Sequence, residues 1–327
     1  MAKQKQTQTS RTTLLPGRRT IILNNNVHGN LGKTTETKRL IEAMTAITGI
    51  RPIIISADPS EPKVLFENYG ERDENGNLLT VQSLEDGVVE IDFAEKDGKL
   101  ANLLAEESIQ NRDVVIDTKG GDFNAFASVY ASLQDFYDAF PDDRFIVLDP
   151  IPAQKSFGNL ETQYQVYSQM RTYTEIHIVR IFSLGMAGSK GNKQELISSY
   201  NQWKQNHPYP SNIQIHEVEF NTEWKGEDMH QFIRFQNGKS SIREAIKSAR
   251  GNPKILSINF LKEGDREWAK ILLPQELREE LAFLPNPTNN RVGEQWGEIL
   301  FEGEIEDIAA SKSDPQEKQK WLDLLRF

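Results

Sequence analysis

The sequence of 327 residues contains no cysteine. Disulfide bonds, thiolate zinc sites and cysteine-bound iron–sulfur clusters are therefore excluded. The sequence also lacks any apolar run near the roughly 18 residues that a membrane-spanning helix needs, and its first residues lack the apolar core of a secretory signal. These absences predict a cytoplasmic protein with no membrane anchor.

Positive charge is also in short supply. The chain has 38 Lys and Arg residues against 48 Asp and Glu residues, which gives a formal net charge of −10. This balance favours solubility and argues against a generally basic nucleic-acid-binding surface. Residues 1–18 are the exception, because they are rich in Gln, Thr and Lys and contain no acid. We predict a disordered basic tail there, whose charge would suit DNA or an acidic partner; a solvated tail without a partner is the alternative.

The most informative stretch is a glycine-containing loop between a predicted strand and a predicted helix. The apolar run at residues 21–23 leads into a polar loop with Gly29 and Gly32, and then into Lys33, Thr34 and a helical pattern. Glycine lets several backbone N–H groups face one phosphate, and the helix N-terminus adds the positive end of its dipole. In this order Lys33 would reach the β- and γ-phosphates of a nucleotide, and Thr34 would coordinate Mg²⁺. The alternative is a helix-capping loop with an exposed lysine.

A second informative stretch places a carboxylate at the end of a strand. Residues 113–117 contain three consecutive apolar residues followed by Asp117. The carboxyl ends of the strands are where open α/β sheets bind ligands, so Asp117 is the candidate to hold Mg²⁺ directly or through water. Gly120 and Gly121 would then form a turn able to sense the γ-phosphate. The alternative is that Asp117 caps the following helix.

Further apolar runs predict the rest of the sheet. They lie within residues 51–57, 144–149, 175–182 and 213–218, and helical patterns separate most of them. Isoleucine-rich runs without alternation are typical of strands covered on both faces. Strands alternating with helices predict an α/β fold with a mostly parallel, doubly wound sheet flanked by helices. We place this domain at residues 19–250 and a C-terminal extension at residues 251–327, where the pattern weakens.

The glycine-containing loop resembles the deviant Walker A loop of the ParA/MinD superfamily, whose form is Lys-Gly-Gly-x-Gly-Lys-Thr-Thr. His28 stands where that superfamily carries its signature lysine, and Asn30 where it carries the second glycine. The Gly-Asn-x-Gly-Lys-Thr-Thr version resembles in particular the plasmid stability and conjugal-transfer ATPases of the StbB and TraL type. The matching positions are Gly29, Asn30, Leu31, Gly32, Lys33, Thr34 and Thr35.

This resemblance implies a SIMIBI-class P-loop ATPase with ATP and Mg²⁺ as cofactors. The loop residues would bind the phosphates, Thr34 and Asp117 would hold the metal, and Lys33, Asp58 and Asp117 would be the catalytic residues. In the superfamily, the second acid of an Asp-x-Asp-Pro sequence orients the attacking water. Asp58 matches that acid, whereas Ser56 replaces the first one. An ordinary Asp-Pro turn is the alternative for Asp58.

The resemblance also implies an ATP-dependent homodimer that acts in plasmid stability, partition or conjugal transfer together with a protein partner. In such dimers the signature lysine crosses to the partner's nucleotide. Here either His28 substitutes weakly for it or Lys119 supplies the charge, and the sequence leaves both open. Preference for adenine rests on the resemblance alone. A membrane contact is not expected, because acidic residues precede the C-terminal amphipathic stretch.

Two other functions fit parts of the pattern. An ATP-dependent ligase or kinase of the dethiobiotin-synthetase type would need a substrate pocket of basic and polar residues, which the sequence does not identify. A non-hydrolysing nucleotide-binding module would fit the breaks in the loop consensus at Val27 and His28. Phosphate release separates these functions from an ATPase.

Overall fold

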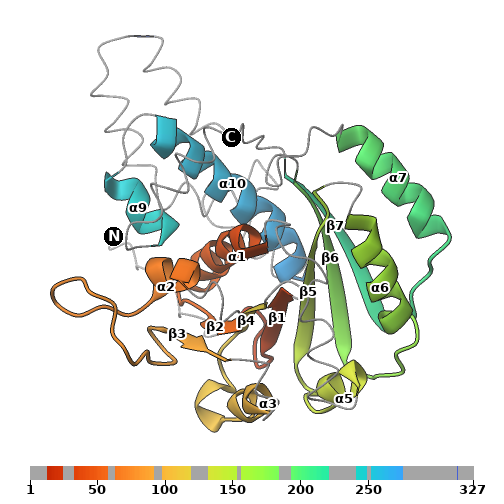
Figure 1. Ribbon diagram of the computed structural model, residues 1–327, viewed down its shortest axis with the longest axis horizontal. Coiled ribbons are helices and arrows are strands. Elements are labelled where there is room, and N and C mark those ends of the chain that lie inside the picture. The colour runs from red at the N-terminus through yellow and green to blue at the C-terminus, as the bar shows by residue number, and fades with distance from the viewer. Residues whose placement is uncertain are drawn as a thin grey trace, which may run out of the picture.

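The computed structural model describes residues 13–24, 33–57, 63–91, 98–118, 132–152, 156–183, 193–220, 241–248, 252–274 and 315. Its centre is one seven-stranded sheet in which all six strand pairings are parallel. Helices cover both faces of this sheet (Figure 1). The predicted α/β fold with a doubly wound parallel sheet is therefore confirmed. Within the described residues, no helix has the length and apolar character to cross a membrane.

The order in which the strands are connected reverses beside β1. Strands β2 and β4 lie on one side of β1, and β5 to β7 lie on the other, so the order of connection reverses at β1. Open α/β sheets bind ligands at such a switch point, beyond the carboxyl ends of the strands. Across the sheet the strands are β3 (Val88–Glu90), β2 (Ile53–Ala57), β4 (Val114–Thr118), β1 (Thr20–Asn24), β5 (Arg144–Pro150), β6 (Glu175–Ser183) and β7 (Ile213–Phe220).

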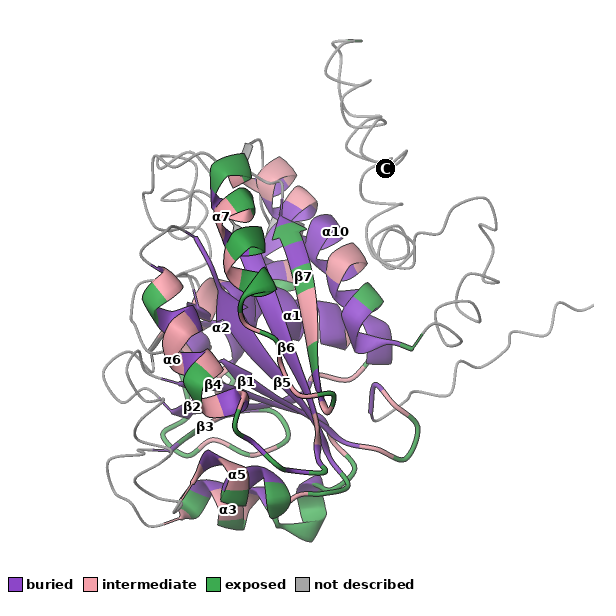
Figure 2. Cartoon of the chain, turned by 90° about the vertical axis from the view of Figure 1, so that its right-hand side faces the viewer, coloured by how far each residue is buried: buried purple, intermediate pink, exposed green. Residues whose placement is uncertain are grey.

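Alternate residues of each strand face opposite helix layers. One layer contains α1 (Lys33–Thr48), α2 (Lys63–Tyr69) and α10 (Asn252–Leu272), which share a core cluster with Ile22 and Ile54. The next residues along the strands, such as Leu23 and Ile55, pack against the other layer. That layer contains α3 (Lys99–Leu104), α5 (Leu133–Asp138), α6 (Phe157–Tyr167) and α7 (Lys193–Gln205). Figure 2 shows the central strands buried, the edge strand β7 partly exposed, and the outer side of α7 exposed.

The chain between α2 and β4 contributes an edge strand to the sheet. The strand in the described part of this segment, β3, pairs parallel with β2 at the edge of the sheet. An isolated antiparallel bridge joins Arg72 to Leu78 within the preceding loop. Beyond β3 come α3 and a short 3-10 helix at Glu107–Ile109. The apolar spacing of Phe126, Val129, Leu133 and Phe136 predicts a helix, and the structure describes its last part as α5 (Leu133–Asp138), since residues 119–131 lie outside the described part.

The long helix α10 was not predicted from the sequence. It spans 21 residues, and α9 (Ile242–Ser248) precedes it. Four charged residues of α10 are buried, so its buried face is not purely apolar: Lys254, Lys262, Glu263 and Asp265. The sequence also predicts a short helix from Pro274 to Leu281, of which residues 275–281 lie outside the described part.

A buried arginine fixes α10 against α1. The Arg39 guanidinium carbon lies 3.7 Å from the ring centre of Phe220 on β7 and 3.9 Å from that of Phe260 on α10. Gly264 passes close to the same side chain, and a Cβ atom added there would lie 2.5 Å from Arg39 Cγ. The glycine therefore permits the close approach of the two helices, and the aromatic rings supply cation–π contacts to a desolvated charge.

Candidate functional site

Three of the predicted site residues, Lys33, Thr34 and Asp117, come together where α1 begins. Asn24 ends β1, and it pairs in register with Asp117 on the neighbouring strand β4. Ser56 on β2 pairs with Asp117 from the other side. Because parallel strands end at the same edge of the sheet, these residues gather in front of the first turn of α1, which starts at Lys33.

Lys33 is a buried lysine at the N-terminus of a helix. Its side chain is held so that Nζ donates a hydrogen bond of 2.7 Å to the carbonyl oxygen of Thr118, and the residue is only 8% exposed. Burying an ammonium group is costly unless polar partners surround it. The Thr118 carbonyl supplies such a partner, so the structure holds the Lys33 amino group at the edge of the sheet, beside helix N–H groups that favour anions.

The Asp117 carboxylate accepts hydrogen bonds from two hydroxyl groups of α1. Thr34 Oγ1 donates to Asp117 Oδ2 at 2.9 Å, and Thr37 Oγ1 donates to Asp117 Oδ1 at 3.1 Å. The carboxylate belongs to a residue that is 5% exposed, whereas Thr34 is half-buried. The side of the carboxylate that meets Thr34 is thus the side nearer to solvent.

The oxygens of Thr34 and Asp117 fit a magnesium ion. Mg²⁺ prefers hard oxygen ligands in an octahedron with bonds of 2.0–2.1 Å, so that neighbouring ligands lie about 2.9 Å apart. The separation of Thr34 Oγ1 and Asp117 Oδ2 is 2.9 Å. No group of three His, Cys, Asp or Glu residues able to hold a metal occurs in the described part of the chain. An ion at this edge would therefore complete its coordination with oxygens of a ligand or water.

Sequence reasoning missed three residues that support this arrangement. Asn24 Nδ2 donates to the carbonyl oxygen of Lys33 at 2.8 Å and to Thr37 Oγ1 at 2.7 Å. Thr118 Oγ1 donates to the carbonyl oxygen of Asn24 at 2.9 Å. All three side chains are buried. The available signals were a polar residue ending the apolar run of β1 and a threonine one turn after Lys33.

The remaining predicted residues fall into two groups. Thr35 is described by the structure: it lies in the first turn of α1 and is half-buried. The others lie outside the described residues, and their roles stay predictions: His28, Gly29, Asn30, Leu31, Gly32, Asp58, Lys119, Gly120 and Gly121.

Comparisons with known proteins give only a distant likeness. No protein-family model matches the chain, and no curated protein matches it. One solved structure, of pNOB8 ParA bound to nonspecific DNA, is similar over 70% of this chain and 98% of that one, with 11% identity and a TM-score of 0.36. A likeness of this strength bears on no ligand, reaction or partner. The sheet order and the helix layers define the fold by themselves.

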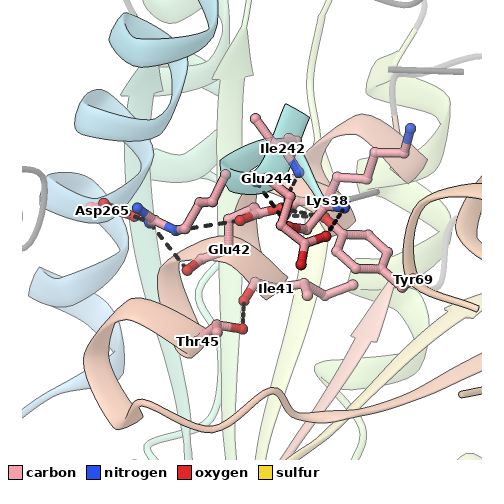
Figure 3. Close-up of polar contacts among 10 residues, drawn as sticks. Lys38, Ile41, Glu42, Thr45, Tyr69, Ile242, Glu244 and Asp265 are labelled. Carbon is pink, nitrogen blue, oxygen red and sulfur yellow. Dashed lines mark hydrogen bonds and ion pairs between the residues drawn. The ribbon is translucent and has the colours of Figure 1, made fainter. Parts of the chain in front are cut away.

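A second buried polar cluster lies farther along α1 (Figure 3). Glu42 Oε1 accepts hydrogen bonds from the hydroxyl of Tyr69 at 2.9 Å and from the backbone N–H of Ile242 at 2.7 Å. Arg243 lies 3.3 Å from Glu42 Oε2 and donates to both carboxylate oxygens of Asp265, at 2.6 and 2.7 Å. This cluster joins α1, α2, α9 and α10.

Burial shifts the titration of this cluster. Desolvation raises the pKa of Glu42 and raises the pKa of Asp265 to about 6, although Arg243 opposes both shifts. Lys38 lies between the two clusters, and burial lowers its pKa to about 8 against the attraction of Glu67, Glu42 and Asp117. The shifted pKa values at Glu42 and Asp265 have a structural cause, since their partners all come from the packed helices.

Two histidines on neighbouring strands, His177 on β6 and His216 on β7, contact each other. His177 Nδ1 lies 2.8 Å from His216 Nε2, and His177 Nε2 lies 2.5 Å from Glu175 Oε1. Burial lowers the pKa of His177 to about 4, so the ring is neutral at pH 7. The pair lies on β6 and β7, and its polar partners are supplied within the sheet.

Proposed function

We propose that this chain is a P-loop ATPase of the ParA/MinD type that binds ATP and Mg²⁺ at the N-terminus of α1. The observation that carries the proposal is the convergence of Lys33, Thr34 and Asp117 at the switch point of a parallel sheet. A buried ammonium group and a helix N-terminus suit phosphate, and a hydroxyl beside a carboxylate suits Mg²⁺. The glycine loop of the sequence joins these elements.

Each residue would then have a defined task. Lys33 would neutralise charge on the β- and γ-phosphates, and Thr34 and Asp117 would hold the metal ion. Bound Mg²⁺ supplies charge neutralisation for the transferred phosphoryl group. Asp58 would orient the attacking water. Because such catalysis consists of positioning and electrostatic stabilisation, we expect slow turnover without a partner.

The cellular role rests on the loop resemblance alone. We propose a nucleotide-dependent homodimer that serves plasmid stability, partition or conjugal transfer with a protein partner. His28 or Lys119 would supply the contact across the dimer, and the basic tail of residues 1–18 would be the route to DNA. The membrane has no part in this proposal.

Titration calorimetry with ATP and Mg²⁺ tests the binding step. Lys33→Ala should lose roughly 100-fold in affinity, because a hydrogen bond to a charged group contributes about 1.5–3 kcal/mol. Lys193→Ala is a matched control, since Lys193 also begins a helix and donates to a strand-end carbonyl, that of Phe220 at 3.1 Å. We expect the control to bind ATP like the wild type. Equal binding by Lys33→Ala and the wild type would refute the assignment.

Steady-state phosphate release, measured with and without DNA, tests the chemical step. An ATPase should release phosphate from ATP with no second substrate. Tight binding without release would instead establish a non-hydrolysing binding module. Phosphate release that requires a second, small organic substrate would favour the ligase or kinase alternative.

A further inference from the structure

The hydrogen bonds behind Asp117 have a fixed direction. The Asn24 amide nitrogen carries two hydrogens, and they point to the carbonyl oxygen of Lys33 and to Thr37 Oγ1. A carbonyl oxygen can only accept, so the nitrogen of Asn24, and not its oxygen, faces Lys33. Thr37 accepts the second hydrogen, and its own hydroxyl hydrogen is thereby directed to Asp117 Oδ1 at 3.1 Å. The chain of donors runs from Asn24 through Thr37 to Asp117.

This chain makes the two carboxylate oxygens of Asp117 unequal. Thr37 is fully buried and Asn24 behind it is fully buried, so Oδ1 is engaged from the protein core. Oδ2 meets the hydroxyl of the half-buried Thr34 instead. A cation that approaches Thr34 from the edge of the sheet therefore meets a single oxygen of Asp117.

Mg²⁺ and Ca²⁺ differ in how many oxygens of one carboxylate they bind. Mg²⁺ demands six ligands in a near-ideal octahedron and takes one oxygen from a carboxylate. Ca²⁺ takes six to eight ligands at 2.3–2.6 Å and accepts both oxygens of one carboxylate. Residues that hold a metal ligand in place typically change metal affinity 10–100-fold when they are replaced.

We propose that Thr37, oriented by Asn24, is a specificity-determining residue that restricts Asp117 to one metal-binding oxygen and so favours Mg²⁺ over Ca²⁺ in the nucleotide complex. The inference rests on the proposed binding of ATP with a divalent cation. It assigns to Thr37 and Asn24 an effect that mere support of the fold would not produce, because a purely structural residue would weaken the complexes of both cations alike.

The test is the ratio of ATP dissociation constants measured by calorimetry in saturating Ca²⁺ and in saturating Mg²⁺. Thr37→Val removes the donor at nearly constant volume and should lower the Ca²⁺-to-Mg²⁺ ratio roughly tenfold. Thr37→Ser keeps the hydroxyl and should retain the wild-type ratio. Thr45→Val is the matched control, since the Thr45 hydroxyl of the same helix donates to the carbonyl oxygen of Ile41 at 2.7 Å, away from Asp117.

A second variant guards against loss of the fold. If thermal melting shows that Thr37→Val is unfolded, Asn24→Leu should shift the ratio in the same direction by a smaller factor, because Thr37 then loses the group that orients its hydroxyl. An unchanged ratio in the folded variants overturns the inference, as does an equal loss for both cations. A wild-type protein that binds ATP with neither cation overturns the proposed function as well, so the two failures are distinguishable.

Discussion

The two buried polar clusters on α1 differ in what surrounds them. At the start of the helix, hydroxyl and amide groups enclose the single carboxylate of Asp117 at the edge of the sheet. Two turns later, Glu42, Arg243 and Asp265 form ion pairs between packed helices. The first cluster presents oxygens toward the place where parallel sheets bind ligands. The second is enclosed by the protein's own helices.

This difference shows that burial and a shifted pKa do not by themselves identify a functional site. Perturbed titration occurs in structural ion-pair networks as well as in active sites. The pKa of Asp265 is raised because the side chain is desolvated between helices. What separates the two clusters is position: strand ends and a helix N-terminus in one, and a helix–helix contact in the other. Mutations in the strand-end cluster around Asp117 should therefore affect ligand binding, and mutations in the helix–helix cluster around Arg243 should affect stability.

Removing Arg243 should have the largest effect on stability. Arg243→Met leaves the carboxylates of Glu42 and Asp265 buried without their cation, and breaking a buried pair in this way costs about 3–5 kcal/mol. Urea denaturation measures the free energy of unfolding. Lys270→Met removes the exposed Lys270–Glu267 pair of α10 and should change it by less than about 1 kcal/mol. If Arg243→Met lowers the free energy of unfolding by less than about 1 kcal/mol, the structural role that we assign to the helix–helix cluster is wrong.

The pH dependence of stability should reveal Asp265. Its pKa is about 6 in the folded protein and near 3.8 when exposed, so the folded state binds the proton more tightly. The stability that this proton contributes is present below pH 4 and is lost as the pH rises through 6. Two pKa units correspond to about 3 kcal/mol. Unfolding measured from pH 4 to 7 should show this loss in the wild type relative to Asp265→Asn; parallel curves would disprove it.

Replacement of Asp117 should lower ATP affinity strongly and change the stability of the protein little. Asp117→Asn removes the anionic oxygen that we assign to the metal ion, and ATP affinity in Mg²⁺ should fall roughly 100-fold. The asparagine oxygen can still accept a hydrogen bond from Thr34 or Thr37, so the free energy of unfolding should change by only about 1 kcal/mol. Asp135→Asn, on the exposed side of α5, is the control for both measurements. A large loss of stability with unchanged binding would reverse the distinction between the clusters.

Gly264 provides the smallest and most local test. An alanine Cβ at this position would lie 2.5 Å from Arg39 Cγ, and overpacking of this kind costs about 1–3 kcal/mol. Denaturation should show that loss in Gly264→Ala. In an Arg39→Ala background the same substitution should cost less, because the clashing side chain is gone. Equal costs in the two backgrounds would place the strain elsewhere.

The sheet could be predicted because each central strand is recognisable from its own short stretch of sequence. Central strands such as β1, β2 and β4 are continuous apolar runs, and the structure buries every residue of them. The meeting of Lys33 and Asp117 at one edge followed from parallel strands ending together. Their roles in binding stay predictions, and the assignments to the loop of residues 25–32 and to Asp58 lie outside the described residues.

The remaining features depend on contacts between distant residues. Thr37 bonds to a carboxylate 80 residues away, and in sequence it is one more polar residue of a helix. Glu42 meets the N–H of Ile242 200 residues away, so its burial cannot be read from its neighbours. Helix α10 was missed for the same reason: its buried Asp265 pairs with Arg243 on α9, and a local pattern records only the polarity of such a residue.

The contact of Arg39 with α10 has a consequence for biosynthesis. Helix α1 emerges from the ribosome early, but the ring of Phe260 and the cation for Glu42 are made more than 200 residues later. Until then, the charged flank of the helix that begins with Lys33 has nothing to enclose it. Long-range closure of this kind slows folding and prolongs the exposure of incomplete surfaces. A nascent chain that ends before α10 should therefore remain a client for chaperones, even with its strand sequences complete.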